Sequence, residues 1–162
     1  MRKEESKNTG WDFGPPIHAT FYTDAGWVMR ITLKMASQFS CSIHGDPLGI
    51  LEWMEGYRLG KCLPLPLNLS SLSPFAKQGL LAIQAIPFGE VRSYREIAER
   101  AGCAKGARAI GNVCNKNPFP LVIPCHRVIS SNGSLGGFAY PFQMKESLIE
   151  FETQKSLVPS ER

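Results

Sequence analysis

A cysteine followed directly by a histidine, Cys125 and His126, lies in residues 124–129, after an apolar run at residues 121–123. A free cysteine has a pKa of ~8.5 and is mostly protonated at neutral pH, so a nucleophilic one needs a neighbouring base. Neighbouring side chains of a strand point to opposite faces, so we expect a water to relay protons between the two residues unless the backbone turns there. The dipeptide alone favours another interpretation, a buried cysteine that behaves as a small hydrophobic residue.

A carboxylate that could orient this histidine lies in a helix predicted from about residue 141 to residue 154. Glu152 follows Leu148 by four residues and borders the apolar stripe that continues to Phe151. A carboxylate on the buried border of a helix needs a polar partner, because an unpaired buried charge is costly. His126 is an available partner, and a surface lysine is the alternative.

Three helices are predicted between residue 73 and the cysteine. Ser73 as N-cap and Pro74 as first helical residue open the first helix, which a Pro-Phe-Gly turn ends. Ser93 and Glu96 form a capping box that opens a short second helix. The third runs from about residue 106 to residue 115, behind a glycine-containing turn. The last two helices are a helix-turn-helix candidate, although any helical hairpin gives the same signal.

The third of these helices has an unusual composition for a core element. Arg108 lies among glycine, alanine and isoleucine in residues 106–111. A smooth face lets the helix backbone approach a partner closely while Arg108 projects beyond it. A helix that reads bases in the major groove needs several polar side chains, and this helix has too few. Its composition fits better an approach from the minor groove, with Arg108 inserted into the base stack. The alternative is close packing between helices with Arg108 in solvent.

The positive charge of the chain is concentrated around these helices. The whole chain has a formal net charge of +4. Residues 91–116 contain six lysines and arginines against two glutamates, so six minus two places +4 in this window alone. A local basic patch is typical of a protein that binds a phosphate backbone, and a solvated helix face is the alternative interpretation.

The first part of the chain predicts a small α/β lobe. Residues 1–16 are polar and contain several glycines and prolines, which predicts a frayed lead-in. The elements expected next are a hairpin, a third strand and a short helix, at residues 17–34, 39–43 and 47–60. A connector broken by prolines follows at residues 62–69. We therefore predict one domain over residues 1–70 and a second over residues 71–162.

The cysteine usage points to a reducing compartment. Five cysteines are spread over 162 residues without a Cys-x-x-Cys pair, which argues against a disulfide framework and against a zinc knuckle. The first ten residues hold no apolar leader, and no run approaches the ~18 apolar residues of a membrane span. We predict a soluble, cytoplasmic protein that does not interact with membranes.

Several separated motifs in residues 74–152 closely resemble the O6-alkylguanine-DNA alkyltransferases, also called methylated-DNA–protein-cysteine methyltransferases. The matching segments are residues 86–89, 93–94, 107–111, 117–118, 124–129 and 145–152. Their common order and spacing make the resemblance specific, and it covers about half of the chain. It implies an RNase H-like α/β N-terminal lobe and an α-helical C-terminal lobe with a winged-helix-like helix-turn-helix.

The resemblance also implies a reaction, which is direct and irreversible repair of DNA. Cys125 would take the alkyl group from O6 of guanine, and O4-alkylthymine is a second candidate substrate. His126 would act as base through a water and Glu152 would orient it, in a relay that resembles a catalytic triad. Tyr94 would crowd the phosphate while the base flips out and would donate a proton toward the guanine.

The DNA contacts that the resemblance implies come from the helix at residues 106–115. Arg108 would fill the place that the flipped base leaves in the stack, with Ala107 and Gly111 against the DNA. Asn117 would tie this helix to the cysteine segment. The expected partner is double-stranded DNA with O6-alkylguanine, approached from the minor groove by a monomer that needs no cofactor.

The substrate pocket is where the sequence departs from the family. Val128, through its carbonyl, and the loop of Phe138, Ala139 and Tyr140 would line it. Many members of the family have tyrosine, serine and glycine in succession in this loop. The missing serine hydroxyl weakens contacts to the guanine O6, and the bulky Tyr140 narrows the pocket. Neither change removes the nucleophile.

Two other functions are open at this point. One is a protein that binds alkyl lesions and signals without repairing them, and the other is a cysteine hydrolase that uses Cys125 and His126. No segment of the sequence can be recognised as an oxyanion hole, which argues against the hydrolase. Zinc-bearing members of the family need cysteine and histidine in the first lobe, where this chain has His18, Cys41, His44 and Cys62. Their spacing matches no metal site, so we predict no required metal.

Overall fold

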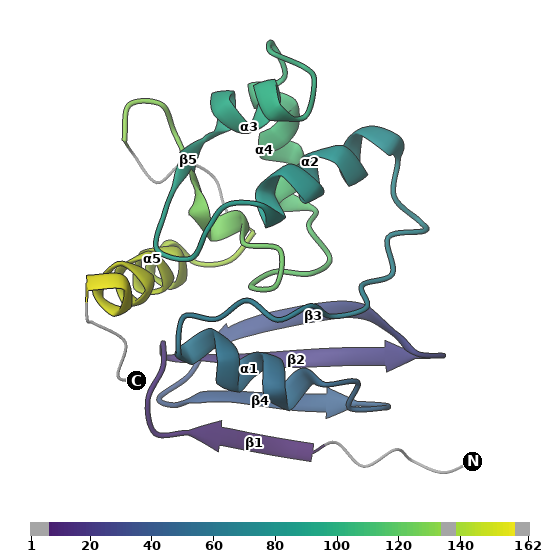
Figure 1. Cartoon of the computed structure of the whole chain (residues 1–162), viewed down its shortest axis with the longest axis vertical. Helices are drawn as coiled ribbons and strands as arrows, with labels where there is room; N and C mark the ends of the chain where they lie inside the picture. Colours follow the sequence, from purple (N-terminus) through teal and green to yellow (C-terminus); the bar gives the residue numbers. More distant parts are fainter. Residues whose placement is uncertain (1–6, 134–138, 158–162) are drawn as a thin grey trace. The chain divides into compact units, whose positions relative to one another are not determined.

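The computed structural model describes residues 7–133 and 139–157, which form two units divided between Asn68 and Leu69 (Figure 1). The first unit is a mixed α/β structure and the second is mainly helical, which confirms the predicted fold class at this level. The division lies close to the predicted boundary after residue 70. None of the helices in the described ranges is long and apolar enough to cross a membrane.

A four-stranded mixed sheet forms the first unit, in the order β1-β4-β2-β3. The strands β1 to β4 have the bounds Lys7–Trp11, Ile17–Asp24, Trp27–Met35 and Phe39–His44. β2 and β3 are an antiparallel hairpin, and β4 pairs with β2 in parallel, so the predicted hairpin and third strand are confirmed. The hairpin turns at Ala25 and Gly26, both with positive φ, which suits the twist of a two-residue hairpin turn.

The prediction of a frayed lead-in is wrong for residues 7–11. This segment is β1, which pairs antiparallel with β4 over its whole length. Its one large apolar side chain is Trp11, whose ring centroid lies 5.5 Å from that of Phe39. A strand that adds to a sheet edge through backbone hydrogen bonds needs no alternating apolar pattern, so its sequence carries no strand signal.

The helix predicted within residues 47–60 is α1, Ile50–Arg58, and it packs on the sheet. Its buried side chains include Trp53 and Tyr57, whose rings stack at 5.4 Å, and the Tyr57 ring lies 5.9 Å from Phe39 of β4. The strands bury the alternating apolar residues Ile17, Ala19, Phe21, Ile31, Leu33, Cys41 and Ile43. This core holds the first unit together and leaves the polar residues of β2 on the other face.

The helices of the second unit begin where the capping residues predict. α2 is Pro74–Gln84, and the Ser73 hydroxyl accepts a hydrogen bond from the Ala76 amide at 3.2 Å. α3 is Tyr94–Arg100, and both hydrogen bonds of the Ser93 and Glu96 capping box are present. α4 is Ala107–Asn115, and it packs on α2 and α3 through residues that include Ile110. α3 and α4 follow each other across a short turn, in the order predicted for the helix-turn-helix candidate.

Two short strands connect the start of α3 to the cysteine segment. β5, Arg92–Ser93, pairs in parallel with β6, Val128–Ile129. Ser93 lies opposite Ile129 in this register, and Tyr94 follows Ser93 directly. The pairing therefore brings the first residue of α3 beside the residues that follow Cys125, although two-residue strands are too short to predict from sequence.

The cysteine segment is not the strand that its apolar run suggests. Residues 121–123 form a turn, and η1, a 3₁₀-helix, spans Cys125–Arg127. Prolines stand at positions 118, 120 and 124, and proline cannot donate a ladder hydrogen bond. The backbone therefore turns at Cys125. The rule that neighbouring side chains of a strand point to opposite faces does not apply to Cys125 and His126. The helix after it, α5, spans Phe142–Leu157.

Candidate active site

Cys125 is the first residue of η1 and is held in the interior of the second unit. Its side chain is 2% exposed. The Cys125 amide donates to the Ile123 carbonyl at 2.8 Å, and the Arg127 amide donates to the Pro124 carbonyl at 2.8 Å. Two backbone hydrogen bonds so close to the thiol fix its position in the turn. Burial of this degree also means that the thiol is shielded from bulk water.

Asn117 connects the thiol to the end of α4. Its side-chain amide donates to the Cys125 sulfur at 3.1 Å and to the Ile123 carbonyl at 2.9 Å, while its carbonyl oxygen accepts from the Phe119 amide at 2.9 Å. All polar atoms of this side chain are therefore used to hold the cysteine segment. The structure thus places Asn117 between the end of α4 and the cysteine segment, and its role as a tie between them stays a prediction.

The resting state of Cys125 is a thiol. Burial raises the pKa of Cys125 well above its ordinary value, and the neighbouring Cys114 thiol raises it further. The hydrogen bond from Asn117 and the charge of Lys145 act in the opposite direction. Because burial is the largest of these effects, the nucleophile has to be deprotonated by a base when it reacts.

His126 and Arg127 both contact the Glu152 carboxylate, and all three side chains are buried. His126 Nε2 lies 2.6 Å from Glu152 Oε2, and Arg127 Nε donates to Glu152 Oε1 at 2.7 Å. Burial alone would raise the pKa of Glu152, but His126 and Arg127 lower it to about 2. Glu152 is therefore an ionised carboxylate, paired with His126 and not with a surface lysine.

The other ring nitrogen of His126 is available as a base. Nδ1 is buried and is the only buried side-chain nitrogen or oxygen, among residues 7–133 and 139–157, without a hydrogen bond. Burial lowers the pKa of His126, and the pairing with Glu152 only partly reverses this effect. A neutral ring that donates from Nε2 to the carboxylate keeps an unprotonated Nδ1, so His126 can accept a proton there.

Sequence reasoning missed Arg127 as a part of this cluster. Its Nη1 donates to the Ile86 carbonyl at 2.7 Å, and its guanidinium lies 5.6 Å from the centre of the Phe88 ring. An arginine that is 2% exposed and holds a carboxylate with two nitrogens fixes the position of that carboxylate. Its only sequence signal was its place directly after His126.

Lys145 is the second residue that sequence reasoning did not single out. Its side chain is fully buried, and Nζ donates to the Val128 carbonyl at 2.6 Å. Nζ also lies 5.7 Å from the centre of the Tyr94 ring. Burial lowers the pKa of Lys145 to about 8. The residue precedes Glu152 by seven positions on α5, so the helical period that pointed to the glutamate also places Lys145 on the buried face.

The residues predicted to touch DNA lie around one open depression. Tyr94, Ala107, Arg108 and Gly111 line it, together with Arg95, Asn112, Asn115, Ser130 and Ser131. Arg108 is exposed, and a Cβ added to Gly111 would meet no atom within 4 Å. The face of α4 is therefore smooth at Gly111 and carries a projecting cation at Arg108, as its composition predicts.

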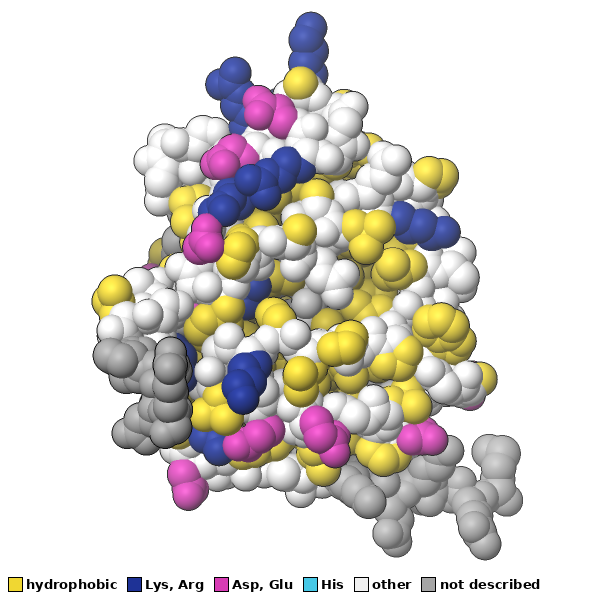
Figure 2. Space-filling model, viewed as in Figure 1, with side chains coloured by type: hydrophobic (Ala, Val, Ile, Leu, Met, Phe, Trp, Pro, Cys, Tyr) yellow, Lys and Arg dark blue, Asp and Glu magenta, His cyan; other side chains and the backbone are white. Residues whose placement is uncertain are grey.

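Two cations of the basic window, Arg95 and Arg108, line this depression. Figure 2 shows Lys and Arg side chains that project from the part of the second unit formed by α3 and α4. Arg92 pairs with Glu90 at 2.7 Å and Arg95 with Glu99 at 3.8 Å. No ion pair within the described ranges involves the other four cations of the window, Arg100, Lys105, Arg108 and Lys116. The positive charge therefore remains available to an anionic partner.

The predicted pocket loop is only partly described. Phe138 lies outside the described residues, Ala139 is exposed and Tyr140 is half-buried. The roles of these three residues in the pocket stay predictions. Within the described part of the chain no three His, Cys, Asp or Glu side chains gather as metal ligands. His18 instead hydrogen-bonds Ser40 at 2.7 Å and Ser42 at 2.8 Å.

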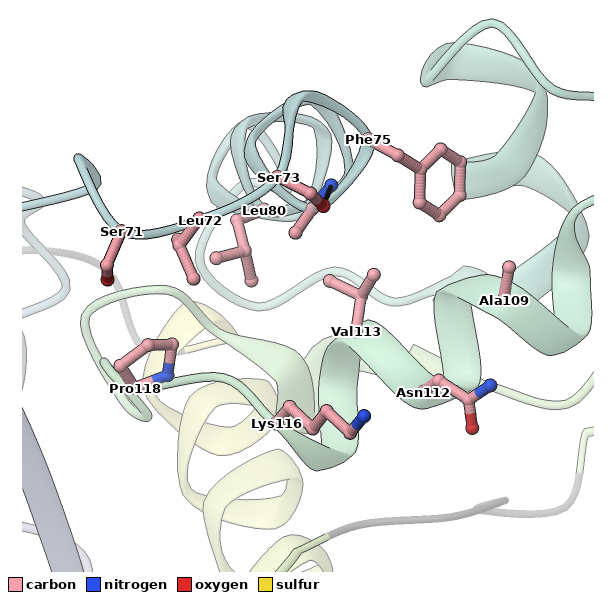
Figure 3. A pocket seen from close by; sticks show the side chains of 11 residues that line it. Ser71, Leu72, Ser73, Phe75, Leu80, Ala109, Asn112, Val113, Lys116 and Pro118 are labelled. Carbon is pink, nitrogen blue, oxygen red and sulfur yellow. Dashed lines mark hydrogen bonds between the residues drawn. The ribbon is translucent and has the colours of Figure 1, made fainter.

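A separate apolar pocket of about 360 Å³ lies between α2 and α4 (Figure 3). Phe75 and Leu80 from α2 and Val113 from α4 line it, and Lys116 lies at its edge. None of the predicted catalytic, DNA-binding or substrate residues belongs to this pocket. The candidate chemistry therefore lies at η1 and α5 and not in this cavity.

Comparison with known proteins matches the chain to a protein family and to several named relatives. Residues 74–154 match the family described as 6-O-methylguanine DNA methyltransferase, DNA binding domain. A methylated-DNA–protein-cysteine methyltransferase of Methanosarcina acetivorans is 39% identical over 100 residues, which are 61% of this chain and 64% of that protein. One from Mycolicibacterium paratuberculosis is 38% identical over 109 residues, 67% of this chain and 66% of that protein. The matches span just under two thirds of the length of these relatives.

The fold has a counterpart among solved structures. Mycobacterium tuberculosis OGT in complex with DNA superposes with a TM-score of 0.70 at 28% identity, over 85% of this chain and 94% of that chain. The family match covers η1, the Glu152 helix and the helix-turn-helix, which are the elements that carry the site. From the family match and these relatives we conclude that the chain belongs to the 6-O-methylguanine DNA methyltransferase family.

Proposed function

We propose that this chain repairs DNA directly, by moving the alkyl group from O6 of an alkylated guanine to the sulfur of Cys125. O4-alkylthymine is a second candidate substrate. The observation that carries the proposal is a buried thiol next to a histidine that is held by a buried carboxylate and keeps Nδ1 unpaired. Membership of the family and the activity for which the relatives are named agree with it.

The proposed reaction begins with loss of the Cys125 proton. His126 Nδ1 takes this proton through a water, while Glu152 holds the ring and stabilises the imidazolium that forms. The thiolate attacks the alkyl carbon, a sulfur–carbon bond forms and the bond from carbon to O6 breaks. Tyr94 supplies a proton toward the guanine as it leaves. The Tyr94 phenolate then takes a proton from water and the His126 imidazolium releases one to water, so that the net change moves the thiol proton to the guanine.

Arg127 and Lys145 act as positioning residues in this scheme. Arg127 holds the Glu152 carboxylate at both oxygens, and Glu152 in turn holds His126. Lys145 places a positive charge near Cys125 and holds the Val128 carbonyl, which belongs to the predicted pocket wall. The thioether product has no good leaving group, so the protein reacts once and is not regenerated.

The proposed substrate is duplex DNA, bound from the minor groove by a monomer. Chemistry on a base inside a duplex requires that the base flips out of the stack. Arg108, exposed on the smooth face of α4, would enter the space that the base leaves. In this proposal α3 and α4 act as a winged-helix-like reader, and the first unit corresponds to an RNase H-like lobe. The OGT named above is in complex with DNA, which supports this choice of partner.

Intact-mass measurement tests the proposed function. The protein is incubated with a duplex oligonucleotide that carries O6-methylguanine, and then digested and mapped. We expect one methyl-sized mass gain per chain, on the peptide that contains Cys125, with no second gain at excess DNA. Tight binding with an unchanged mass would instead identify a lesion-binding protein without repair activity, and repeated turnover would contradict the acceptor role of Cys125.

Replacing Arg108 by alanine should slow repair in duplex DNA more than reaction with the free modified base. The reason is that flipping costs a few kcal/mol, and loss of the residue that fills the gap leaves this cost uncompensated. We expect a decrease of about tenfold or more in the duplex rate, with little change for the free base. The measurement is single-turnover methyl transfer to Cys125 with both substrates.

The matched control for this experiment is Arg100→Ala. Arg100 is an exposed cation of the same patch, but it does not line the depression. Both variants lose one charge and should lose a similar amount of salt-dependent affinity. If Arg108→Ala slows the duplex and free-base reactions equally, Arg108 instead contributes to the stability of the fold and not to base flipping.

A further inference from the structure

Two asparagines of α4 carry side-chain amides that the fold does not use. Asn112 and Asn115 are both exposed, and in residues 7–133 and 139–157 neither side-chain amide makes a hydrogen bond. Asparagine has a lower helix propensity than alanine, and an amide without a local hydrogen bond does not offset this cost. The two residues therefore weaken a nine-residue helix, and their amides are free to contact a partner outside the chain.

Both amides lie on the face of α4 that is proposed to meet DNA. Asn112 and Asn115 follow Arg108 by four and seven residues, so the three side chains form one stripe along the helix. All three line the open depression that Tyr94 also lines. Asn112 also borders the apolar pocket, but Figure 3 shows its amide directed away from α2. The amide is thus presented on the side of the depression.

Asn112 is close enough to Arg108 to reach a neighbouring base pair. An α-helix rises about 1.5 Å per residue, so the two residues lie about 6 Å apart along the helix axis. Successive base pairs of a duplex are about 3.4 Å apart. The helix surface next to Asn112 is open, because a Cβ added to Gly111 would meet no atom within 4 Å. When Arg108 fills the gap in the base stack, the Asn112 amide therefore lies beside the adjoining base pairs.

A side-chain amide matches the minor-groove edge of guanine. The amide of asparagine donates from Nδ2 and accepts at Oδ1. An A·T pair presents only acceptors in the minor groove, whereas a G·C pair adds the N2 amino group of guanine as a donor. Guanine N3 and N2 can therefore form two hydrogen bonds with one amide, and an A·T pair can form one.

We propose that Asn112 reads the minor-groove edge of the base pair beside the flipped guanine, and that it favours a guanine in this pair. The inference rests on the proposed function, because Arg108 has to occupy the place of the flipped base. Asn115 has a different role. It lines the depression together with Ser130 and Ser131, and amide and hydroxyl side chains are typical contacts of phosphate oxygens. Asn115 therefore positions the DNA without reading its sequence.

Equilibrium binding of the full-length protein tests this assignment without alkyl transfer. The probe is a duplex with a stable abasic analogue, which places the gap for Arg108 at a known position. The adjoining pair on either side is G·C or I·C, because inosine lacks only the N2 amino group of guanosine. The preference for G·C is the ratio of the two dissociation constants. This preference should be at least about fivefold larger in the wild type than in Asn112→Ala, on one of the two sides.

Two other amide variants are the matched controls. Asn115→Ala should weaken binding to all of these duplexes by the same factor. Gln78 is an exposed amide of α2 that does not line the depression, so Gln78→Ala should leave every affinity unchanged. Asn112→Ala should keep or raise the melting temperature, because alanine favours the helix and no hydrogen bond is lost. A changed preference in this variant therefore does not come from unfolding.

The same preference for G·C in the wild type and in Asn112→Ala, on both sides of the gap, would overturn the inference. The abasic probe carries no alkyl group, so this outcome is separate from a failure of the proposed function. A wild type that shows the preference but gains no methyl group from O6-methylguanine DNA would refute the transfer and keep the role of Asn112. Absence of duplex binding would overturn both.

Discussion

Replacing Cys125 by serine should abolish alkyl transfer and leave binding to duplex DNA in place. The serine hydroxyl is far less acidic than a thiol, and the neutral His126 is too weak a base to generate an alkoxide through a water. The proposed DNA contacts lie on α3 and α4, away from the thiol itself. We therefore expect no methyl-sized mass gain with O6-methylguanine DNA, and a duplex affinity close to that of the wild type.

The control for this variant is Cys103→Ser, which removes an exposed thiol of the same unit. It should keep full stoichiometric transfer, since Cys103 takes no part in the cluster around η1. Methylation of the Cys125→Ser protein at the stoichiometry of the wild type would show that another residue is the acceptor, which contradicts the proposed mechanism. Loss of both transfer and DNA affinity, together with a lower melting temperature, would show that serine disturbs the buried turn.

Local signals in the sequence predicted the helices of the second unit well. Ser73 and the Ser93–Glu96 box each cap the helix that they were expected to open, because a cap depends on residues a few positions apart. Glu152 was expected near His126 from the apolar period of α5, and its carboxylate contacts that ring. These features need no knowledge of the tertiary fold.

The features that were missed depend on tertiary contacts. β1 is a strand only because β4 offers it a free edge, and η1 turns where prolines exclude the expected strand. Arginine and lysine are normally surface residues, so nothing in composition marks Arg127 and Lys145 as buried. The motifs of the sequence identified the reacting groups, whereas the residues that hold these groups in place could be found only from the packing of the fold.

Replacing Arg127 by methionine should produce a large loss of stability. Methionine fills much of the same space, but it leaves the buried Glu152 carboxylate without the cation that contacts both of its oxygens. Removal of one partner of a buried ion pair costs about 3–5 kcal/mol of unfolding free energy. Urea denaturation measures this loss, and Arg95→Met, which breaks an exposed pair of the same unit, should cause a far smaller change.

A double variant separates stability from chemistry. Arg127→Met with Glu152→Gln removes the uncompensated charge, so part of the lost unfolding free energy should return. Alkyl transfer should remain slow, because a neutral amide does not stabilise the imidazolium that forms on His126. Recovery of the wild-type transfer rate in the double variant would show that the carboxylate has no part in the reaction and serves only to pair Arg127.

The pH dependence of stability should report the same carboxylate. The pKa of Glu152 is about 2 in the folded protein, against about 4.3 for an unfolded glutamate. A lowered folded-state pKa stabilises the fold above the unfolded pKa, by about 3 kcal/mol here, and this contribution disappears as pH falls from about 4 to 2. In Arg127→Met the pKa of Glu152 should rise, so the decline over this range should become shallower. An unchanged decline would mean that His126 alone keeps the carboxylate ionised.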